Sequence, residues 1–146
     1  AQIYTRQGRL VEAASLLERI VQIKDSPGLE LARLGELRMA VGDTEGAIRA
    51  FERSRQLLVG EFTYHLELGV LYLANRQLTE AAKSLDRVSP AHPGYSMALF
   101  KRAQVSVLLS EPDHVERVQG AWANADDATR PLIESERLFE GIALPD

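Results

Sequence analysis

Three histidines, His65, His92 and His114, are the side chains best suited by type to metal binding or acid–base catalysis. A helix that binds a metal places two ligands about one turn apart, as in a His-x-x-x-His arrangement, and no two of these histidines have that spacing. A catalytic histidine also needs partner groups that converge on it, and the sequence offers none. We therefore expect no catalytic residue, no bound metal and no cofactor.

Other segments that could carry chemistry have simpler interpretations. Residues 42–46 are Gly-Asp-Thr-Glu-Gly, which lacks the lysine and the preceding strand of a phosphate loop and is typical of a turn between helices. The chain has no Cys and no Gly-x-Ser-x-Gly motif, so it has neither a thiol nucleophile nor a serine elbow. Arg49, Arg53 and Arg55 lie among glutamates and predict an exposed charged helix face rather than a phosphate track. We therefore predict that the protein is not an enzyme.

Length, composition and charge describe a soluble, folded protein of 146 residues that is 45% hydrophobic and 26% charged. The net charge of -4 argues against a nucleic-acid binder; residues 111–146 carry nine acidic and three basic side chains, interrupted by apolar residues. No apolar run approaches the roughly 18 residues of a membrane span, and the first residues lack the pattern of a signal peptide. We expect no nucleic-acid binding and no membrane insertion, and the compartment, cytoplasmic or periplasmic, stays open.

The sequence repeats with a period of 34 residues, and such a period determines the architecture. Leu34-Gly35 aligns with Leu68-Gly69. Small and large residues form two further columns at the same period, one of Ala13, Ala47 and Ala81 and one of Leu17, Phe51 and Leu85.

Each repeat predicts two helices. In one repeat, apolar residues spaced by three and four predict a helix over 29–41, and a second helix follows the turn at 42–44, where Asp43 or Thr44 can serve as the cap. The next repeat predicts helices over 64–73 and 78–88, and a further first helix is expected over 95–109. Gly35, Gly69, Ala47 and Ala81 would let the paired backbones approach closely beside Phe51 or Leu85.

These residues resemble the tetratricopeptide repeat, whose signature places a large residue, Leu-Gly, Tyr, Ala, Phe and Pro at set positions of a 34-residue helix pair. Residues 28–61 match with Leu31, Leu34, Gly35, Ala47 and Phe51, and residues 62–95 match with Leu68, Gly69, Tyr72, Ala81, Leu85 and Pro93. The resemblance implies an all-α, right-handed superhelical α-solenoid with a C-terminal capping helix.

The other segments fit this family less closely. Residues 1–27 are predicted to be a partial repeat, with Ala1 and Tyr4 at the end of a first helix and a complete second helix after it, so we expect further repeats before Ala1. Residues 96–129 form a divergent repeat, in which Trp122 is expected to fill the space left by Gln119 at the Phe position. A last helix over 131–144 is predicted to be the cap within 130–146, and residues 1–146 together form one domain.

The family resemblance also implies a concave groove lined by the first helix of each pair. The residues at groove positions that we assign to partner binding are Leu29, Glu36, Met39, Thr63, Leu66, Val70, Leu73, Met97, Phe100, Gln104 and Val107. They are mostly apolar and lack the Lys, Asn and Arg with which some family members grip a terminal carboxylate. The groove therefore favours an apolar helix or extended segment as partner.

Two questions stay open at this point: what covers the groove residues, and which of two functions the protein has. The same apolar residues could be covered within the chain, for example by the last helix folding back into the groove. The function expected is a non-catalytic scaffold that binds a protein or peptide of unknown identity. The alternative is a repeat segment that mediates homo-oligomerisation or the assembly of a larger complex.

Overall fold

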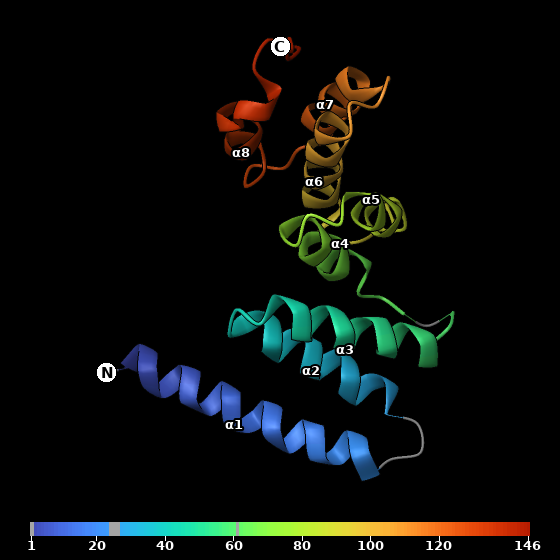
Figure 1. Ribbon diagram of the computed structural model, residues 1–146. Helices are drawn as coiled ribbons and strands as arrows, with labels where there is room; N and C mark the ends of the chain where they lie inside the picture. The colour runs from blue at the N-terminus through green and yellow to red at the C-terminus, as the bar shows by residue number, and fades with distance from the viewer. Residues whose placement is uncertain (1, 24–26, 61) are drawn as a thin grey trace. The chain divides into compact units, whose positions relative to one another are not determined.

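The computed structural model describes residues 2–23, 27–60 and 62–146, with side chains from residue 6 onward. Ala1 and the side chain of Tyr4, both assigned to the partial repeat, lie outside the described residues. All regular structure in the described ranges is helical, which confirms the predicted all-α fold (Figure 1). The chain divides into two compact units, Ala1–Tyr64 and His65–Asp146. The right-handed superhelix and the repeat boundaries remain predictions.

The first unit contains α1 (Gln2–Ile23), α2 (Gly28–Ala40) and α3 (Thr44–Leu57). The pair α2 and α3 matches the predicted helix pair to within one or two residues. The turn between them has Gly42 at a φ of 84°, and an Asp43 carboxylate oxygen accepts a hydrogen bond of 3.0 Å from the Gly46 N–H. Residues 42–46 are therefore a helix cap, as predicted, because this carboxylate already takes the amide that a phosphate loop would present.

α1 differs from the prediction, because residues 2–23 form one continuous helix instead of two helices joined by a turn. Gly8 lies one period before Gly42 and yet is helical. The residue after Gly42 is Asp43, which caps the next helix, whereas the residue after Gly8 is Arg9, which cannot accept a capping hydrogen bond. Without that cap, continuing the helix satisfies more backbone groups than breaking it.

The second unit begins with two helix pairs, α4 (His65–Ala74) with α5 (Leu78–Asp86), and α6 (Tyr95–Leu108) with α7 (His114–Ala123). These bounds confirm the predicted helices to within about two residues at each end. The 34-residue period is also visible in the backbone, because a left-handed residue ends the first helix of each pair: Gly42, then Arg76 at φ 61°, then Ser110 at φ 54°. This conformation turns the chain back so that the second helix lies along the first.

Small residues allow close packing within the pairs, as predicted. A Cβ atom on Gly35 would lie 2.8 Å from the Phe51 ring, and one on Gly69 would lie 2.7 Å from the Leu85 side chain. Ala47 and Ala81, on the facing helices, are fully buried. The energetic cost of glycine within a helix is therefore offset by the close fit of a large side chain from the partner helix.

The end of the chain corrects the predicted helix over 131–144. The structure has a short α8 (Arg130–Ser135), an extended residue at Glu136 with ψ 115°, and a single 3-10 turn, η1 (Arg137–Phe139). Ile133 and Phe139 are both buried in the same core cluster as Phe100. In a continuous α-helix these two side chains would point about 120° apart, so the chain has to break for both to reach that core.

A buried arginine links three helices of the second unit. Arg102 on α6 is 6% exposed, and it lies 2.9 Å from Asp86 at the end of α5 and 3.1 Å from Glu111 in the turn before α7. Arg117 on α7 pairs with the same two carboxylates and with Asp113. Burial by itself would lower the pKa of Arg102, but the hydrogen bonds that it donates to Glu111 and Asp86, together with the charges of these two carboxylates, outweigh burial and raise it. Arg102 therefore stays charged and holds the three helices together.

We predict that Gly35→Ala lowers the free energy of unfolding by about 1–3 kcal/mol, because the new methyl group overpacks against the buried Phe51 ring. The matched control is Gly8→Ala in the same unit, where no atom lies within 4 Å of the added Cβ. This control should gain about 0.5–1 kcal/mol from helix propensity. Urea unfolding followed by circular dichroism measures both, and an equal effect of the two substitutions would contradict the close-packing account.

For the buried ion pairs, we predict that Asp86→Asn combined with Glu111→Gln costs about 3–5 kcal/mol, since Arg102 is then charged and buried without a carboxylate. Arg102→Met should cost clearly less, because Asp86 is half exposed and Glu111 still has Arg117 at 3.4 Å. Thermal and urea unfolding of both variants test this order. If Arg102→Met is the more damaging change, the buried arginine does not depend on the two carboxylates as we describe.

Candidate binding groove

Four of the predicted groove residues belong to the first unit, and all four are exposed. Leu29, Glu36 and Met39 lie on α2, with Leu29 60% exposed, and Thr63 lies in the segment that follows α3. The family's groove positions thus correspond here to an open strip of side chains along one side of α2. The hollow between α1, α2 and α3, which is described below, is lined by none of these four residues.

Three predicted residues follow one another along α4 of the second unit, at spacings of four and three. Leu66, Val70 and Leu73 are half-buried and share one face of the helix. Leu66 packs against the segment that precedes α6, since a side chain on Gly94 would clash with it. Leu73, at the end of α4, borders a hollow that is described below.

The remaining predicted residues are on α6, and the chain itself covers most of them. Phe100 is 4% exposed and meets Phe139 of η1 edge to face, with 6.0 Å between the ring centroids. Met97 and Val107 are partly buried against the same cluster. Fold-back of the C-terminal segment, one of the two alternatives that the sequence left open, is therefore what the structure contains along this part of α6, and Phe100 offers no surface to a partner there.

The divergent residues of α7 hold this C-terminal segment in place. Gln119 donates a hydrogen bond of 3.0 Å to the Ala143 carbonyl, and the Trp122 indole N–H donates one of 2.6 Å to the Pro145 carbonyl. The Arg130 guanidinium lies over the Trp122 ring, 4.7 Å from its centroid. Trp122 packs against the core as predicted, and its role beyond filling space is to anchor the last residues of the chain.

A hollow of about 290 Å³ remains between α4, α6 and η1. Its walls combine apolar side chains with two cations and one amide, from Leu73, Ala74, Arg76, Lys101, Gln104, Leu108 and Leu138. Two predicted groove residues, Leu73 and Gln104, meet here. We call this hollow the α4–α6 groove.

The polar groups of the α4–α6 groove can recognise a polypeptide. The Gln104 Oε1 atom is buried and has no hydrogen-bond partner among the described residues, a state that costs about 1–3 kcal/mol. The Gln104 residue as a whole is half-buried and lines the groove, so if its amide turns toward the groove, a partner that donates an N–H to the oxygen would remove that cost. No carboxylate is among the described side chains that line the groove, whereas Arg76 and Lys101 are. The groove therefore suits a segment with an apolar side chain and no net positive charge.

Sequence reasoning missed Arg76, Lys101 and Leu138 as lining residues. Arg76 is a turn residue, and Lys101 is adjacent to a groove position without occupying one. Leu138 comes from the segment whose break at Glu136 was not predicted. The two cations can be recognised in the sequence as charged residues close to groove positions, whereas no feature of the sequence indicates that Leu138 forms the third wall of the groove.

The three histidines have ordinary structural surroundings. The His92 Nδ1 atom accepts a hydrogen bond of 2.8 Å from the Gly94 N–H, and His114 Nδ1 lies 2.8 Å from the Glu111 carbonyl oxygen. His65 is half-buried at the start of α4. Within the described ranges, no three His, Asp or Glu side chains come together in a way that could hold a metal ion.

The comparison with protein families matches the tetratricopeptide repeat over residues 32–105, about half of the chain. The protein therefore belongs to the tetratricopeptide repeat family. Repeats of this family generally mediate protein–protein interactions, and the family is typically a non-catalytic scaffold. Comparisons with curated proteins and with solved structures found no match. In the described part of the chain, no helix has both the length and the apolar character needed to cross a membrane.

The C-terminal segment that walls the groove starts from a capped turn. The Asp126 carboxylate accepts a hydrogen bond of 2.8 Å from the backbone N–H of Thr129, the N-cap residue of α8. Hydrogen bonds from the Thr129 side chain and from its backbone N–H lower the pKa of Asp126 below the ordinary value of an aspartate. The charged carboxylate thus stabilises the start of α8.

We predict that this contribution is complete above the ordinary aspartate pKa and is lost as the pH falls through the lowered pKa of the folded state. Fluorescence of Trp122, the only tryptophan, reports on it because Arg130 at the start of α8 covers the ring. An acid titration of the wild type should show a step that Asp126→Asn lacks, since an amide does not titrate. Identical acid profiles for the two proteins would contradict the role assigned to Asp126.

Proposed function

We propose that this protein is a non-catalytic scaffold that binds a segment of a partner protein in the α4–α6 groove. The observation that carries the proposal is the groove itself, an open hollow lined by leucines around an amide oxygen that has no hydrogen-bond partner. Open apolar hollows with a few convergent polar groups are the usual form of a binding site.

The groove supplies an anchor and an orienting contact for a partner. Leu73, Leu108 and Leu138 come from three different elements and present apolar surface to a single side chain of the partner. The Gln104 amide, once turned toward the groove, can pair with a backbone N–H beside that side chain. This combination, one buried apolar anchor with a main-chain hydrogen bond, is how peptide-binding grooves obtain affinity and register.

The lining residues also support a binding role over a catalytic one. None of the described residues around the groove is a serine, histidine or carboxylate, so a nucleophile paired with a base is lacking there. The partner is a protein or peptide, and the compartment in which the two meet follows from the partner's own location.

A second candidate function, assembly with further copies or with a larger complex, is favoured by the outer face of α1. Leu16 is 58% exposed, Ile20 41% and Ile23 82%, and their spacing of four and three places them on one face. Light scattering of the wild type and of Leu16→Asp separates the two functions. A larger species that Leu16→Asp reduces to a monomer supports assembly, and a wild-type monomer at all concentrations rejects it.

To test the groove, we compare Leu108→Asp with Leu109→Asp in copurification from the source cells. Leu108 lines the groove, whereas its neighbour Leu109 is 37% exposed and does not. We expect specific partners to be recovered at least tenfold less with Leu108→Asp, equivalent to about 1.4 kcal/mol of binding free energy, and unchanged with Leu109→Asp. A buried charge opposite an apolar anchor accounts for the loss.

Circular dichroism verifies that both variants keep the wild-type helix content. Lys101→Glu, a change at the groove wall that buries no new charge in the core, serves as the second variant if Leu108→Asp loses helix. Equal recovery with all variants, or equal loss with Leu109→Asp, would reject the α4–α6 groove as the binding site.

A further inference from the structure

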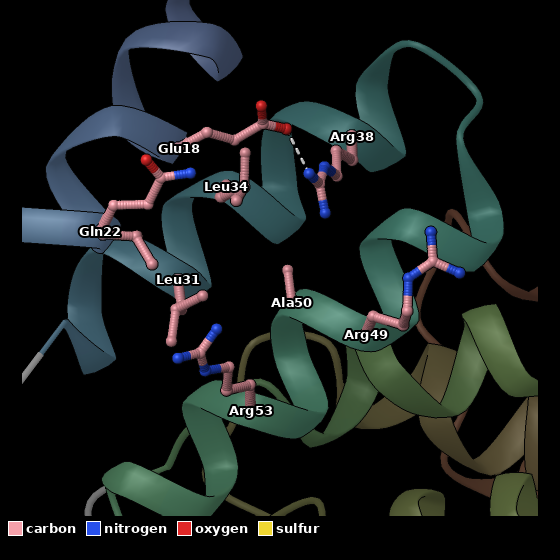
Figure 2. Close-up of a pocket in the computed structure, with 9 residues that line it drawn as sticks. Glu18, Gln22, Leu31, Leu34, Arg38, Arg49, Ala50 and Arg53 are labelled. Atoms are coloured by element: carbon pink, nitrogen blue, oxygen red, sulfur yellow. Dashed lines mark hydrogen bonds and ion pairs between the residues drawn. The ribbon is translucent and has the colours of Figure 1, made fainter.

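A second hollow, of about 490 Å³, lies within the first unit between α1, α2 and α3. Figure 2 shows its lining side chains, which come from Glu18, Val21, Gln22, Leu31, Leu34, Arg38, Arg49, Ala50 and Arg53. None of them is a groove position of the repeat, and none belongs to the unit that contains the α4–α6 groove. We call this hollow the arginine pocket.

The floor of the arginine pocket is apolar and well packed. Leu31, Leu34 and Ala50 are each 3% exposed, and they belong to the tightly packed α2–α3 pair. The Arg38, Arg49 and Arg53 side chains lie on different sides of the hollow, around Ala50 (Figure 2). The pocket therefore combines an apolar, well-packed floor with guanidinium groups around its edge.

Only one of the three arginines is fully engaged. Arg38 forms an ion pair with Glu18 and donates a hydrogen bond of 3.2 Å to the Gly46 carbonyl. Arg49 lies 3.9 Å from Glu45, and both side chains are about 70% exposed, so this pair contributes little. Arg53 makes no hydrogen bond and no ion pair with any described residue. Two guanidinium groups are thus available to a ligand.

The charge around the pocket selects an anion. Three arginines face one carboxylate, that of Glu18, so the pocket carries an excess of positive charge at neutral pH. The excess is local, because residues 1–64 as a whole carry nine basic and nine acidic side chains. A long polyanion such as a nucleic acid would need a broader basic surface, whereas a single anionic group fits a local one.

The apolar floor of the arginine pocket favours an anionic group that is attached to an apolar one. A free inorganic anion would fill only a small part of this hollow of about 490 Å³, whose floor is formed by Leu31, Leu34 and Ala50. A carboxylate side chain with an apolar residue beside it would pair with Arg49 and Arg53 and also cover that floor. Guanidinium groups bind carboxylates in a bidentate geometry, which gives such a contact direction as well as charge.

We propose that the arginine pocket binds an acidic segment of a partner polypeptide, in which a Glu or Asp lies next to an apolar residue. This site is separate from the α4–α6 groove and gives the protein a second, electrostatic contact with its partners. Two contacts on one chain raise the overall affinity for a partner that can reach both. The arginine pocket would then select partners by charge and the groove by shape.

The test uses the peptide Leu-Glu-Glu-Leu-amide with a fluorophore on its N-terminal nitrogen, and its counterpart with Gln in place of both Glu residues. Fluorescence anisotropy measures binding to the complete chain. We expect saturable binding of the Glu peptide and at least tenfold weaker binding of the Gln peptide. Arg53→Gln should weaken binding of the Glu peptide at least tenfold, because it removes the guanidinium that has no other partner.

Two control variants make the result specific to this pocket. Arg33→Gln removes an exposed arginine of α2 that does not line the pocket, and Leu108→Asp alters the α4–α6 groove. Both should bind the Glu peptide like the wild type. Arg53 is exposed, so Arg53→Gln is expected to keep the fold, and circular dichroism verifies this.

Several outcomes would overturn the proposal. They are the absence of saturable binding at about 1 mM peptide, equal affinity for the Gln peptide, equal loss with Arg33→Gln, or loss with Leu108→Asp while Arg53→Gln binds normally. Displacement of the peptide by inorganic phosphate at a similar concentration would assign the pocket to phosphate instead of to an acidic polypeptide.

Discussion

The close approach of paired helices is the constraint on which the rest of this structure depends. At Gly35 and Gly69 the first helix has no side chain, and Phe51 or Leu85 of the second helix lies where a Cβ would be. The facing alanines, Ala47 and Ala81, are fully buried. Since the glycine lies near the middle of the first helix, this contact determines how the two helices align and therefore which residues of each pair face outward.

The third helix pair, α6 and α7, lacks this glycine contact and makes a different one. Ala103 replaces the glycine on α6, and α7 has Gln119 and Trp122 where the repeat would place apolar packing residues. Both side chains instead donate hydrogen bonds to carbonyls of the last residues of the chain. The residues of α7 that depart from the repeat pattern are thus the ones that hold the C-terminal segment where it folds back onto α6.

One face of α6 is partly covered by the C-terminal segment and partly lines the α4–α6 groove. The C-terminal segment buries Phe100 beneath Ile133 and Phe139, and next to this core it adds Leu138 as a wall of the α4–α6 groove. The C-terminal segment therefore covers the core at Phe100 and, with Leu138, forms part of the adjacent α4–α6 groove. This explains why the groove is short and local, and why its polar groups come from the turn after α4 and from α6 rather than from each first helix in succession.

The sequence by itself determined the helix pairs, their 34-residue period, the turn at residues 42–46 and the positions where small residues pack, because each of these depends on local spacing and capping. It also identified Leu73 and Gln104, two residues of the α4–α6 groove. Only the tertiary structure decided that residues 2–23 form one helix, that the chain breaks at Glu136, and that Arg38, Arg49 and Arg53 surround one hollow with Glu18. These outcomes depend on contacts between residues far apart in the chain, and helical periodicity does not say which exposed side chains another helix will bring together.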